Sequence, residues 1–257
     1  MANVLIKKTG KIAIVTVNRP QQMNSMNSKT RFELFQAFDG LSFDSNISVI
    51  ILTGAPGKAF IAGADIKEFL ERDLSSQEAL EEDWIVTKVI SNLSKPVIAM
   101  IDGFCLGGGL EIAMACDLRI ASNRSKLGQP EINLGIIPGA GGTQRLTRLI
   151  GEGRAMEMIL TGRMITAKEA CNYGILNFIY SAEELETKTM EIANSIADKS
   201  SYAIERAKKS VKVVSRLNLE KGLKFEREMF IECANSKDGK EGITAFIEKR
   251  KPEFKGH

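Results

Sequence analysis

The sequence Gly107-Gly108-Gly109-Leu110-Glu111 begins the most informative part of the chain, which continues with Gly128-Gln129-Pro130-Glu131 and Gly135-Ile136-Ile137-Pro138-Gly139-Ala140-Gly141-Gly142-Thr143-Gln144-Arg145. Three glycines before an apolar, helix-forming run expose backbone N–H groups at a helix start, where negative charge is favoured. A carboxylate one turn further on, with a second from another segment, supplies the two proton-handling groups that acid/base catalysis needs. The pattern therefore predicts chemistry on a carbonyl compound whose oxygen becomes an anion.

The sequence around this stretch has the pattern of an α/β protein. Runs rich in β-branched residues predict strands at residues 4–8, 12–18, 49–52, 96–101 and 117–121. Helical spacing predicts a helix at 28–43, with Ser28 as its N-cap, and a charged helix at 76–93 that contains Trp84. After Gly139 we expect almost only helices, at 143–150, 152–160, 167–173, 182–198, 201–215, 219–232 and 238–249. An α/β core over residues 1–195 would then carry a helical portion over residues 196–257.

Composition and charge narrow the classes of function. The 257 residues are 44% hydrophobic with a net charge of +3, which gives no reason to expect a nucleic-acid partner. Basic clusters at 206–209 and 249–251 are more typical of solvated helix faces or tails, although a lysine there can still meet a phosphate. No apolar run approaches the ~20 residues that span a bilayer, and the N-terminus lacks the apolar region of a secretory signal. We therefore expect a cytoplasmic protein without a membrane partner.

Cysteine and histidine usage excludes several catalytic designs. The four cysteines are widely spaced and predict reduced thiols, mostly in the core: Cys105, Cys116, Cys171 and Cys233. The only histidine is the last residue, His257, where we expect disorder. A Ser-His-Asp triad, a Cys-His pair and a histidine metal cluster are thereby excluded. Acid/base chemistry in this chain must come from carboxylates.

The glycine-rich segments differ in what they indicate. Residues 54–58 and 151–153 lack the spacing of a P-loop or a dinucleotide fingerprint and are better interpreted as turns. At residues 61–67 small side chains permit close approach of a ligand, and Asp65 is placed to cap a helix entered at Ile66, although a tight strand-to-helix connection fits equally well. Glu111 lies among apolar residues, where a carboxylate without a partner or a function is costly. Glu131 is weaker taken alone, because Pro-Glu at a helix start is common.

Taken together, these motifs resemble the enoyl-CoA hydratase/isomerase (crotonase) family. The resemblance rests on Ala62-Gly63-Ala64-Asp65-Ile66-Lys67, Gly107-Gly108-Gly109-x-Glu111 and the run from Gly128 to Leu146, in that order. Weaker features flank them at 18–20, 24, 27, 95–96 and 246–250. The match covers nearly the whole chain and implies a crotonase-like α/β spiral of strand-strand-helix units. It also implies a helical C-terminal portion that assembles the chain into a homotrimer or a dimer of trimers.

The resemblance also implies roles for individual residues. The thioester oxygen would lie between the backbone N–H groups of Ala64 and Gly108. Glu111 would hold the water and take its proton, and Glu131 would supply the proton at Cα. One of these carboxyls should be protonated near neutral pH, as part of a coupled pair. Further positions along the substrate would be Ala62, Asp65, Ile66, Lys67, Gly139, Asn24 and Met26. Of these, Lys67 would approach the CoA phosphates or adenine, and Gly139, opening the helix after Pro138, would shape the water pocket.

The implied reaction is the reversible hydration of a short-chain 2-enoyl-CoA to a 3-hydroxyacyl-CoA, and dehydration of 3-hydroxypropionyl-CoA is compatible with it. No metal or redox cofactor is expected, because CoA belongs to the substrate. Leu110 and residues 76–93 would bear on acyl chain length, and Trp84 is expected in the core or an interface rather than in the acyl pocket. Two alternatives stay open. One is a Δ3,Δ2-enoyl-CoA isomerase, which typically keeps one acidic residue here. The other is a non-catalytic, RNA-binding member, which would need a basic face with interleaved aromatic residues.

Overall fold

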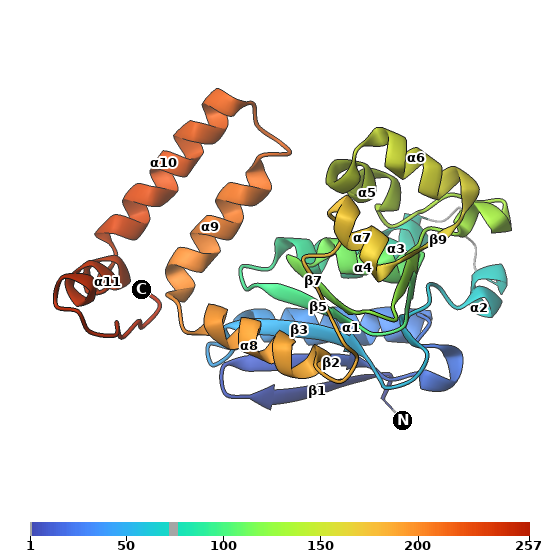
Figure 1. The fold of residues 1–257 in the computed structure, drawn as a ribbon, viewed down its shortest axis with the longest axis horizontal. Coiled ribbons are helices and arrows are strands. Elements are labelled where there is room, and N and C mark those ends of the chain that lie inside the picture. Colours follow the sequence, from blue (N-terminus) through green and yellow to red (C-terminus); the bar gives the residue numbers. More distant parts are fainter. Residues whose placement is uncertain (1, 72–76) are drawn as a thin grey trace.

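The chain folds around two β-sheets (Figure 1). The structure is a computed structural model that describes residues 2–71 and 77–257, without the side chains of residues 69 and 77–84. The larger sheet has the strand order β1 (Val4–Thr9), β2 (Ile12–Val17), β3 (Val49–Gly54), β5 (Val97–Ile101), β7 (Leu118–Ser122) and β10 (Phe178–Tyr180). The smaller sheet has the order β4 (Ala59–Ile61), β6 (Phe104–Leu106), β8 (Lys126–Gly128) and β9 (Met164–Thr166). Neighbouring strands are parallel except for the β1–β2 and β8–β9 pairs.

A strand-strand-helix unit recurs along the chain and connects the two sheets. Strand β3 is followed by β4 and the helices α2 (Ile66–Glu71) and α3 (Gln77–Asn92), and β5 by β6 and α4 (Gly108–Ala115). Strand β7 is followed by β8, the 3-10 helix η2 (Glu131–Leu134) and α5 (Gly142–Ile150). Because β4, β6 and β8 are parallel neighbours, the segments that leave their carboxyl ends lie side by side. The repeat therefore brings three segments that are distant in sequence to one place.

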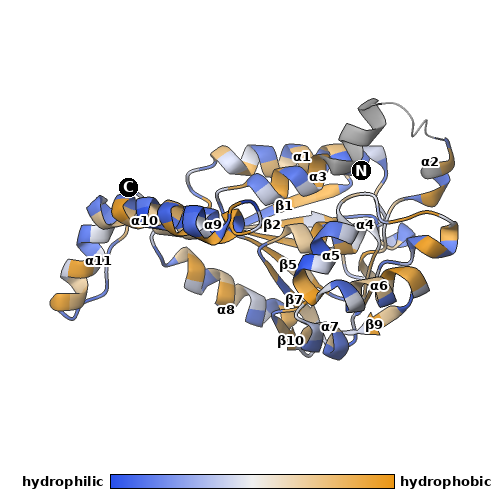
Figure 2. Cartoon of the chain, turned by 90° about the horizontal axis from the view of Figure 1, so that it is seen from above, coloured by the Kyte–Doolittle hydropathy of each residue, from blue (hydrophilic) through white to orange (hydrophobic). Residues whose placement is uncertain are grey.

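Helices cover both faces of the larger sheet, which explains its nearly continuous hydrophobic strands. Helix α1 (Ser28–Phe43) and α3 lie on one face, where α1 contributes the buried Leu34 and Phe38 to the main core. Helix α8 (Leu185–Ala197) lies on the opposite face, where its Leu185 and Ala193 pack against Ile51 and other strand residues (Figure 2). Alternate residues of each strand thus enter two separate cores.

The remaining helices complete the chain. Helices α6 (Glu152–Thr161) and α7 (Ala167–Tyr173) flank β9, and a short 3-10 helix, η1, covers Pro20–Gln22. Helices α9 (Ser201–Val213) and α10 (Leu219–Asn235) form an antiparallel pair that projects from the α/β body, with α11 (Lys237–Ile247) and the C-terminus at its far end (Figure 1). The division at residues 195/196 remains a prediction of domain organisation. No helix in the described ranges is long and apolar enough to cross a bilayer.

Most predicted elements are present, and the differences have local causes. The segment after Gly139 is not almost only helical, because β9 and β10 were missed; each is three residues long. The N-cap of α1 is Asn27 rather than Ser28, since the Asn27 side chain accepts a hydrogen bond from Thr30 N at 2.9 Å. The helix after Pro138 begins at Gly142 rather than at Gly139. The predicted environment of Trp84 lies outside the described side chains.

The C-terminal basic cluster and tail are more structured than the sequence indicates. Lys208 Nζ lies 2.6 Å from Asp117 Oδ2, so this lysine anchors α9 to the sheet instead of joining a solvated face. Burial lowers the pKa of Lys208, against the opposing effect of Asp117. The expected disorder of His257 is wrong, because Asp238 N donates to its carbonyl oxygen at 2.9 Å. Two of the four free cysteines, Cys105 and Cys116, are buried, as predicted for core thiols.

Candidate active site

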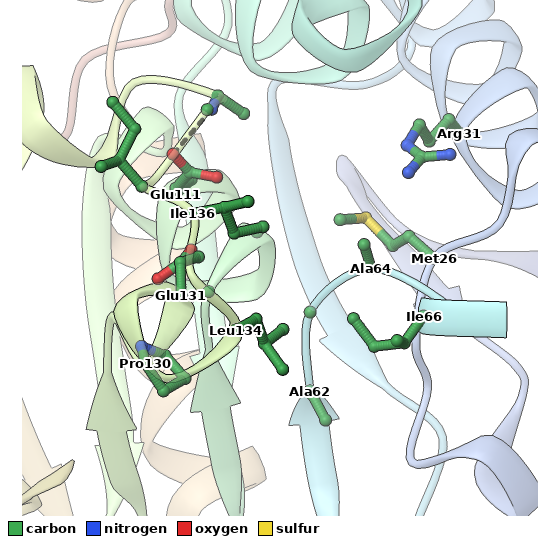
Figure 3. A pocket seen from close by; sticks show the side chains of 16 residues that line it. Met26, Arg31, Ala62, Ala64, Ile66, Glu111, Pro130, Glu131, Leu134 and Ile136 are labelled. Atoms are coloured by element: carbon green, nitrogen blue, oxygen red, sulfur yellow. Dashed lines mark hydrogen bonds between the residues drawn. The ribbon is translucent and has the colours of Figure 1, made fainter. Parts of the chain in front are cut away.

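A pocket of about 290 Å³ opens where β4, β6 and β8 end. Its walls come from the β4–α2 connection, the start of α4, η2 with the loop after it, and α1. Figure 3 shows both glutamates on one side of this pocket and Ala62, Ala64 and Ile66 on the other. The structure thus brings together the two glycine-rich glutamate segments and the small-residue segment that the sequence singled out.

Glu111 is held in a fixed orientation by two backbone donors. It lies in the first turn of α4, and only 3% of the residue is exposed. Its Oε1 accepts hydrogen bonds of 2.7 Å from both Ala140 N and Gly142 N. Two N–H donors on one oxygen favour the charged form of a carboxylate. The second oxygen, Oε2, takes part in neither of these bonds, and Glu111 is one of the residues that line the pocket.

The loop that supplies these donors is fixed by Arg145. Arg145 Nη1 donates to Ala140 O at 2.9 Å, so the loop is bound by Arg145 through a carbonyl and by Glu111 through N–H groups. Gly141 has a φ of +106°, and a Cβ added there would collide with the Arg145 guanidinium. The charge of Glu111 raises the pKa of Arg145, although burial is the larger effect and lowers it. The Gly-Gly-x-x-Arg pattern therefore orients Glu111.

Glu131 has a different environment at the first residue of η2. Burial raises its pKa to about 7, and the charge of Glu111 adds to the increase. The amide of the fully buried Gln129 lies beside this carboxyl; with the amide nitrogen on that side, Nε2 is 2.8 Å from Oε1 and 3.1 Å from Oε2. Such donors favour the charged form and oppose the shift, so the raised pKa of Glu131 comes from its buried position and the charge of Glu111.

Each glycine of the 107–109 triplet meets a different requirement. Gly107 has a φ of +52°, and a Cβ there would lie 3.1 Å from Glu131 Oε1. Gly108 is the first residue of α4 and lines the pocket. A Cβ on Gly109 would lie 2.1 Å from Ile61 O, so only glycine lets α4 pack this closely on β4. The triplet therefore serves both the pocket, through Gly107 and Gly108, and the packing of α4 on β4, through Gly109.

Ala64 and Gly108, at the start of α4, lie close together at the pocket. A Cβ built on Gly108 would lie 4.0 Å from Ala64 N. Within the described ranges, neither N–H donates to a protein acceptor outside the regular elements, and the first N–H of a helix has no partner inside it. Ala64 forms an isolated parallel bridge with Met26, whose bonds use Gly63 O and Asp65 N. This leaves Ala64 N directed to the opposite side, toward α4.

The other predicted contact residues divide into two groups. Those that line the pocket are Ala62, Ile66, Gly139 and Met26. Three do not line it: Lys67, which is exposed on α2, and Asp65 and Asn24. Asp65 Oδ2 pairs with Arg19 Nη2 at 2.8 Å, and Asn24 is fully buried with its amide bonded to backbone groups. The structure therefore gives the side chains of Asp65 and Asn24 internal partners, and the substrate contacts of these two residues stay predictions.

Several pocket residues were missed by the sequence analysis: Arg31, Pro130, Leu134, Ile136 and Ile137. Arg31 is only 5% exposed, and its Nη1 lies 3.5 Å from Glu68 Oε1. The available signal was a charged residue on the apolar face of the 28–43 helix, three positions before Leu34. No group of three or more His, Cys, Asp or Glu side chains in the part of the chain that the structure describes is placed to hold a metal ion.

Comparison with known proteins agrees with this geometry. The family model described as Enoyl-CoA hydratase/isomerase matches residues 7–257. The chain belongs to the enoyl-CoA hydratase/isomerase family. The family and fold predicted from the sequence are thereby confirmed. Over 254 residues the chain is 44% identical to a short-chain-enoyl-CoA hydratase of Clostridium acetobutylicum, covering 98% of this chain and 97% of that one. It is 41% identical to a crotonyl-CoA hydratase of Syntrophomonas wolfei, over 98% and 97% of the two chains.

Solved structures of enoyl-CoA hydratases share the fold along their whole length. The structure of the Bacillus anthracis enzyme superimposes with a TM-score of 0.95 at 41% identity, covering 99% of this chain and 100% of that one. A Geobacillus kaustophilus enoyl-CoA hydratase subunit gives 0.94 at 39% identity, with 99% and 98% covered. The two-sheet architecture and the projecting C-terminal helices are therefore features of enoyl-CoA hydratase structures and not peculiarities of this chain.

Proposed function

We propose that this protein is a short-chain enoyl-CoA hydratase, a hydro-lyase that adds water reversibly across the Cα=Cβ bond of a 2-enoyl-CoA. The observation that carries the proposal is the pair of glutamates in one pocket with different hydrogen-bond environments. Glu111 accepts two backbone N–H bonds, which favour its charge, while burial raises the pKa of Glu131 to about 7. A base and an acid can thus coexist in the site near neutral pH.

The proton transfers follow from these environments. Ionised Glu111 takes a proton from the attacking water, whose oxygen bonds to Cβ, and protonated Glu131 delivers a proton to Cα. One proton enters the carboxyl pair and one leaves it, so the net reaction consumes only water. In reverse, the same pair removes the Cα proton and protonates the departing hydroxyl, as in dehydration of a 3-hydroxyacyl-CoA such as 3-hydroxypropionyl-CoA. No cofactor takes part, since CoA belongs to the substrate.

The Ala64 and Gly108 N–H groups complete this mechanism as an oxyanion hole. When water adds at Cβ, negative charge develops on the thioester oxygen as an enolate forms. Two preorganised donors directed at that oxygen stabilise the charge, and removal of one such donor costs about 3 kcal/mol in the transition state. The free N–H at the start of α4 and the Ala64 N–H, turned away from its bridge with Met26, support this assignment.

Loss of enoyl-thioester absorbance on mixing with crotonyl-CoA tests the proposal. We expect fast loss with the wild type and a decrease in rate of at least 100-fold for Glu111→Gln and Glu131→Gln, since general acid or base catalysis contributes about 10²–10⁴-fold. Asp39→Asn, a change of an exposed carboxyl on α1, serves as the control and should retain full activity. Wild-type protein that is inactive on crotonyl-CoA but converts a 3-enoyl-CoA would instead identify an isomerase. Inactivity on both would favour a non-catalytic role.

We further propose that the chain assembles as a homotrimer or dimer of trimers through its C-terminal helices. Large apolar side chains are exposed on α10 and α11: Leu219, Leu223, Phe230, Ile231, Ile243, Phe246 and Ile247. Exposed apolar surface of this extent on projecting helices is typical of a protein–protein interface. Light scattering coupled to size-exclusion chromatography measures the mass directly, and a monomer of 28.2 kDa would contradict the proposal.

A further inference from the structure

The segment that carries Ala64, here called the oxyanion loop (Ala62–Asp65), is supported along its outer side by residues 23–26. Three backbone bonds join the two segments: Ala62 N to Met23 O at 3.2 Å, Met26 N to Gly63 O at 2.9 Å, and Asp65 N to Met26 O at 2.9 Å. Because successive peptide groups of an extended chain point to opposite sides, bonds through Gly63 and Asp65 turn Ala64 N the other way. The position of residues 23–26 therefore sets the direction of the proposed oxyanion donor.

Residues 23–26, here called the support segment, include two residues with unfavourable backbone angles. Met23 and Asn24 have φ values of 50° and 55°, in the left-handed region that side chains disfavour. The buried Asn24 amide compensates: its oxygen accepts from Arg19 N at 3.0 Å, and its nitrogen donates to Ala55 O at 3.0 Å and Ala59 O at 2.7 Å. The turn is thus fixed to Ala55, directly after β3, to Ala59 of β4 and to Arg19.

Arg19 bonds to the support segment and to the oxyanion loop with the same guanidinium. Its Nη1 donates to Ser25 O at 2.6 Å, and its Nη2 lies 2.8 Å from Asp65 Oδ2. The two side chains are only 13% and 20% exposed. Hydrogen bonding to Arg19 lowers the pKa of Asp65, and the N–H groups of Lys67 and Glu68 at the start of α2 lower it further. Asp65 therefore joins Arg19 to both the loop and the helix that follows.

We propose that Arg19 and Asp65 are positioning residues that aim the Ala64 N–H into the oxyanion hole. Neither side chain is part of the pocket wall, so we assign both to positioning rather than to catalysis. The inference rests on the proposed function, because it assigns Ala64 N to the thioester oxygen. Arg19 reaches two acceptors on different segments from two nitrogens of one rigid fork, a geometry that the single nitrogen of a lysine does not reproduce.

Kinetics provide the first part of the test, with Arg19→Lys, Arg19→Met and Asp65→Asn assayed on crotonyl-CoA. Complete loss of one oxyanion donor costs about 10²–10³-fold in kcat, so a misaimed donor should cost less, about 10–100-fold for Arg19→Met. KM should change by less than about threefold, because the pocket wall is unaltered. Asp65→Asn is expected to fall between the wild type and Arg19→Met, and it carries the test if Arg19→Met does not fold. Arg148→Met, at an exposed arginine of α5, is the matched control.

A spectroscopic signature separates positioning from general damage. The CoA thioester of 4-dimethylaminocinnamic acid absorbs at longer wavelength when strong hydrogen bonds polarise its carbonyl. We expect a clear red shift on binding to wild type and to Arg148→Met, and at most half of that shift with Arg19→Met or Asp65→Asn. If the shift of a folded variant equals that of the wild type, or if kcat is unchanged, the positioning role is wrong. A wild type that neither hydrates crotonyl-CoA nor shifts this probe would refute the proposed function itself.

Discussion

Replacing Glu131 by glutamine should abolish activity while making the folded protein more stable at alkaline pH. The carboxyl is placed in a pocket where burial and the nearby charge of Glu111 disfavour its ionised form, so its pKa rises to about 7 from an ordinary 4.5. Whatever raises the pKa of a carboxyl in the folded state reduces folding stability wherever that carboxyl must be charged. Glutamine has nearly the same shape and cannot ionise, so the substitution removes this cost.

The size and the pH range of the effect follow from the pKa. Below pH 4.5 the carboxyl is protonated in both the folded and the unfolded chain, and Glu131 costs nothing. Stability is lost progressively as the pH rises from 4.5 to about 7, and above that range the full cost is present. At about 1.4 kcal/mol per pKa unit the gap corresponds to about 3 kcal/mol, which solvent screening of a partly exposed group reduces to about 2–3 kcal/mol.

Denaturant unfolding of the wild type and Glu131→Gln at pH 5 and pH 8.5, at equal protein concentration, provides the assay. The stability advantage of the variant should grow by about 2 kcal/mol between the two pH values. Asp39→Asn removes an exposed carboxyl and should show no such pH-dependent gain. An advantage of equal size at both pH values, or a variant less stable than the wild type at pH 8.5, would refute the electrostatic account of Glu131.

Three further predictions concern catalysis, packing and assembly. Because protonated Glu131 supplies the Cα proton and its pKa is about 7, kcat/KM for hydration of crotonyl-CoA should decline above pH 7; a profile without that decline would contradict the role of Glu131 as the acid. Gly109→Ala should fail to yield soluble protein or should unfold at much lower denaturant, since its Cβ would lie 2.1 Å from Ile61 O; a melting curve like that of the wild type would contradict the packing. Phe246→Asp, at a side chain that is 85% exposed, should lower the mass in light scattering toward that of one chain without loss of secondary structure in circular dichroism.

Periodicity and turn chemistry were sufficient to predict most of the fold. Strands such as 49–52 and 96–101 form long apolar runs because both sheet faces are covered, and that pattern is visible in sequence. Strands β9 and β10 were missed because three residues are too few to establish an alternation. The residue ranges of the helices after Gly139 were close to those observed, while their starting positions depend on single capping bonds such as that of Asn27.

The site was predictable to the extent that its residues lie in short motifs. Glu111 and Glu131 could be found because each lies within a few residues of glycines that have their own geometric reason to be there. The internal roles of Asp65 and Asn24 could not be found in this way. Asp65 pairs with Arg19 across 46 positions of sequence, and a contact of that separation has no local signal. The small residues of this segment therefore indicate a ligand, but they do not reveal which side chains hold the segment in place.

One loop explains why two chemically identical side chains can serve as base and acid. Residues 135–142 leave η2, which begins with Glu131, and end at the N-terminus of α5. Their first half contributes Ile136 and Ile137 to the apolar wall of the pocket that Glu131 also lines. Their second half turns the N–H groups of Ala140 and Gly142 onto Glu111. A change in the course of this loop would alter both environments together, so acid and base strength should vary jointly in loop variants. Independent adjustment of either carboxyl requires substitutions outside the loop, and Gln129 beside Glu131 is the position the structure offers.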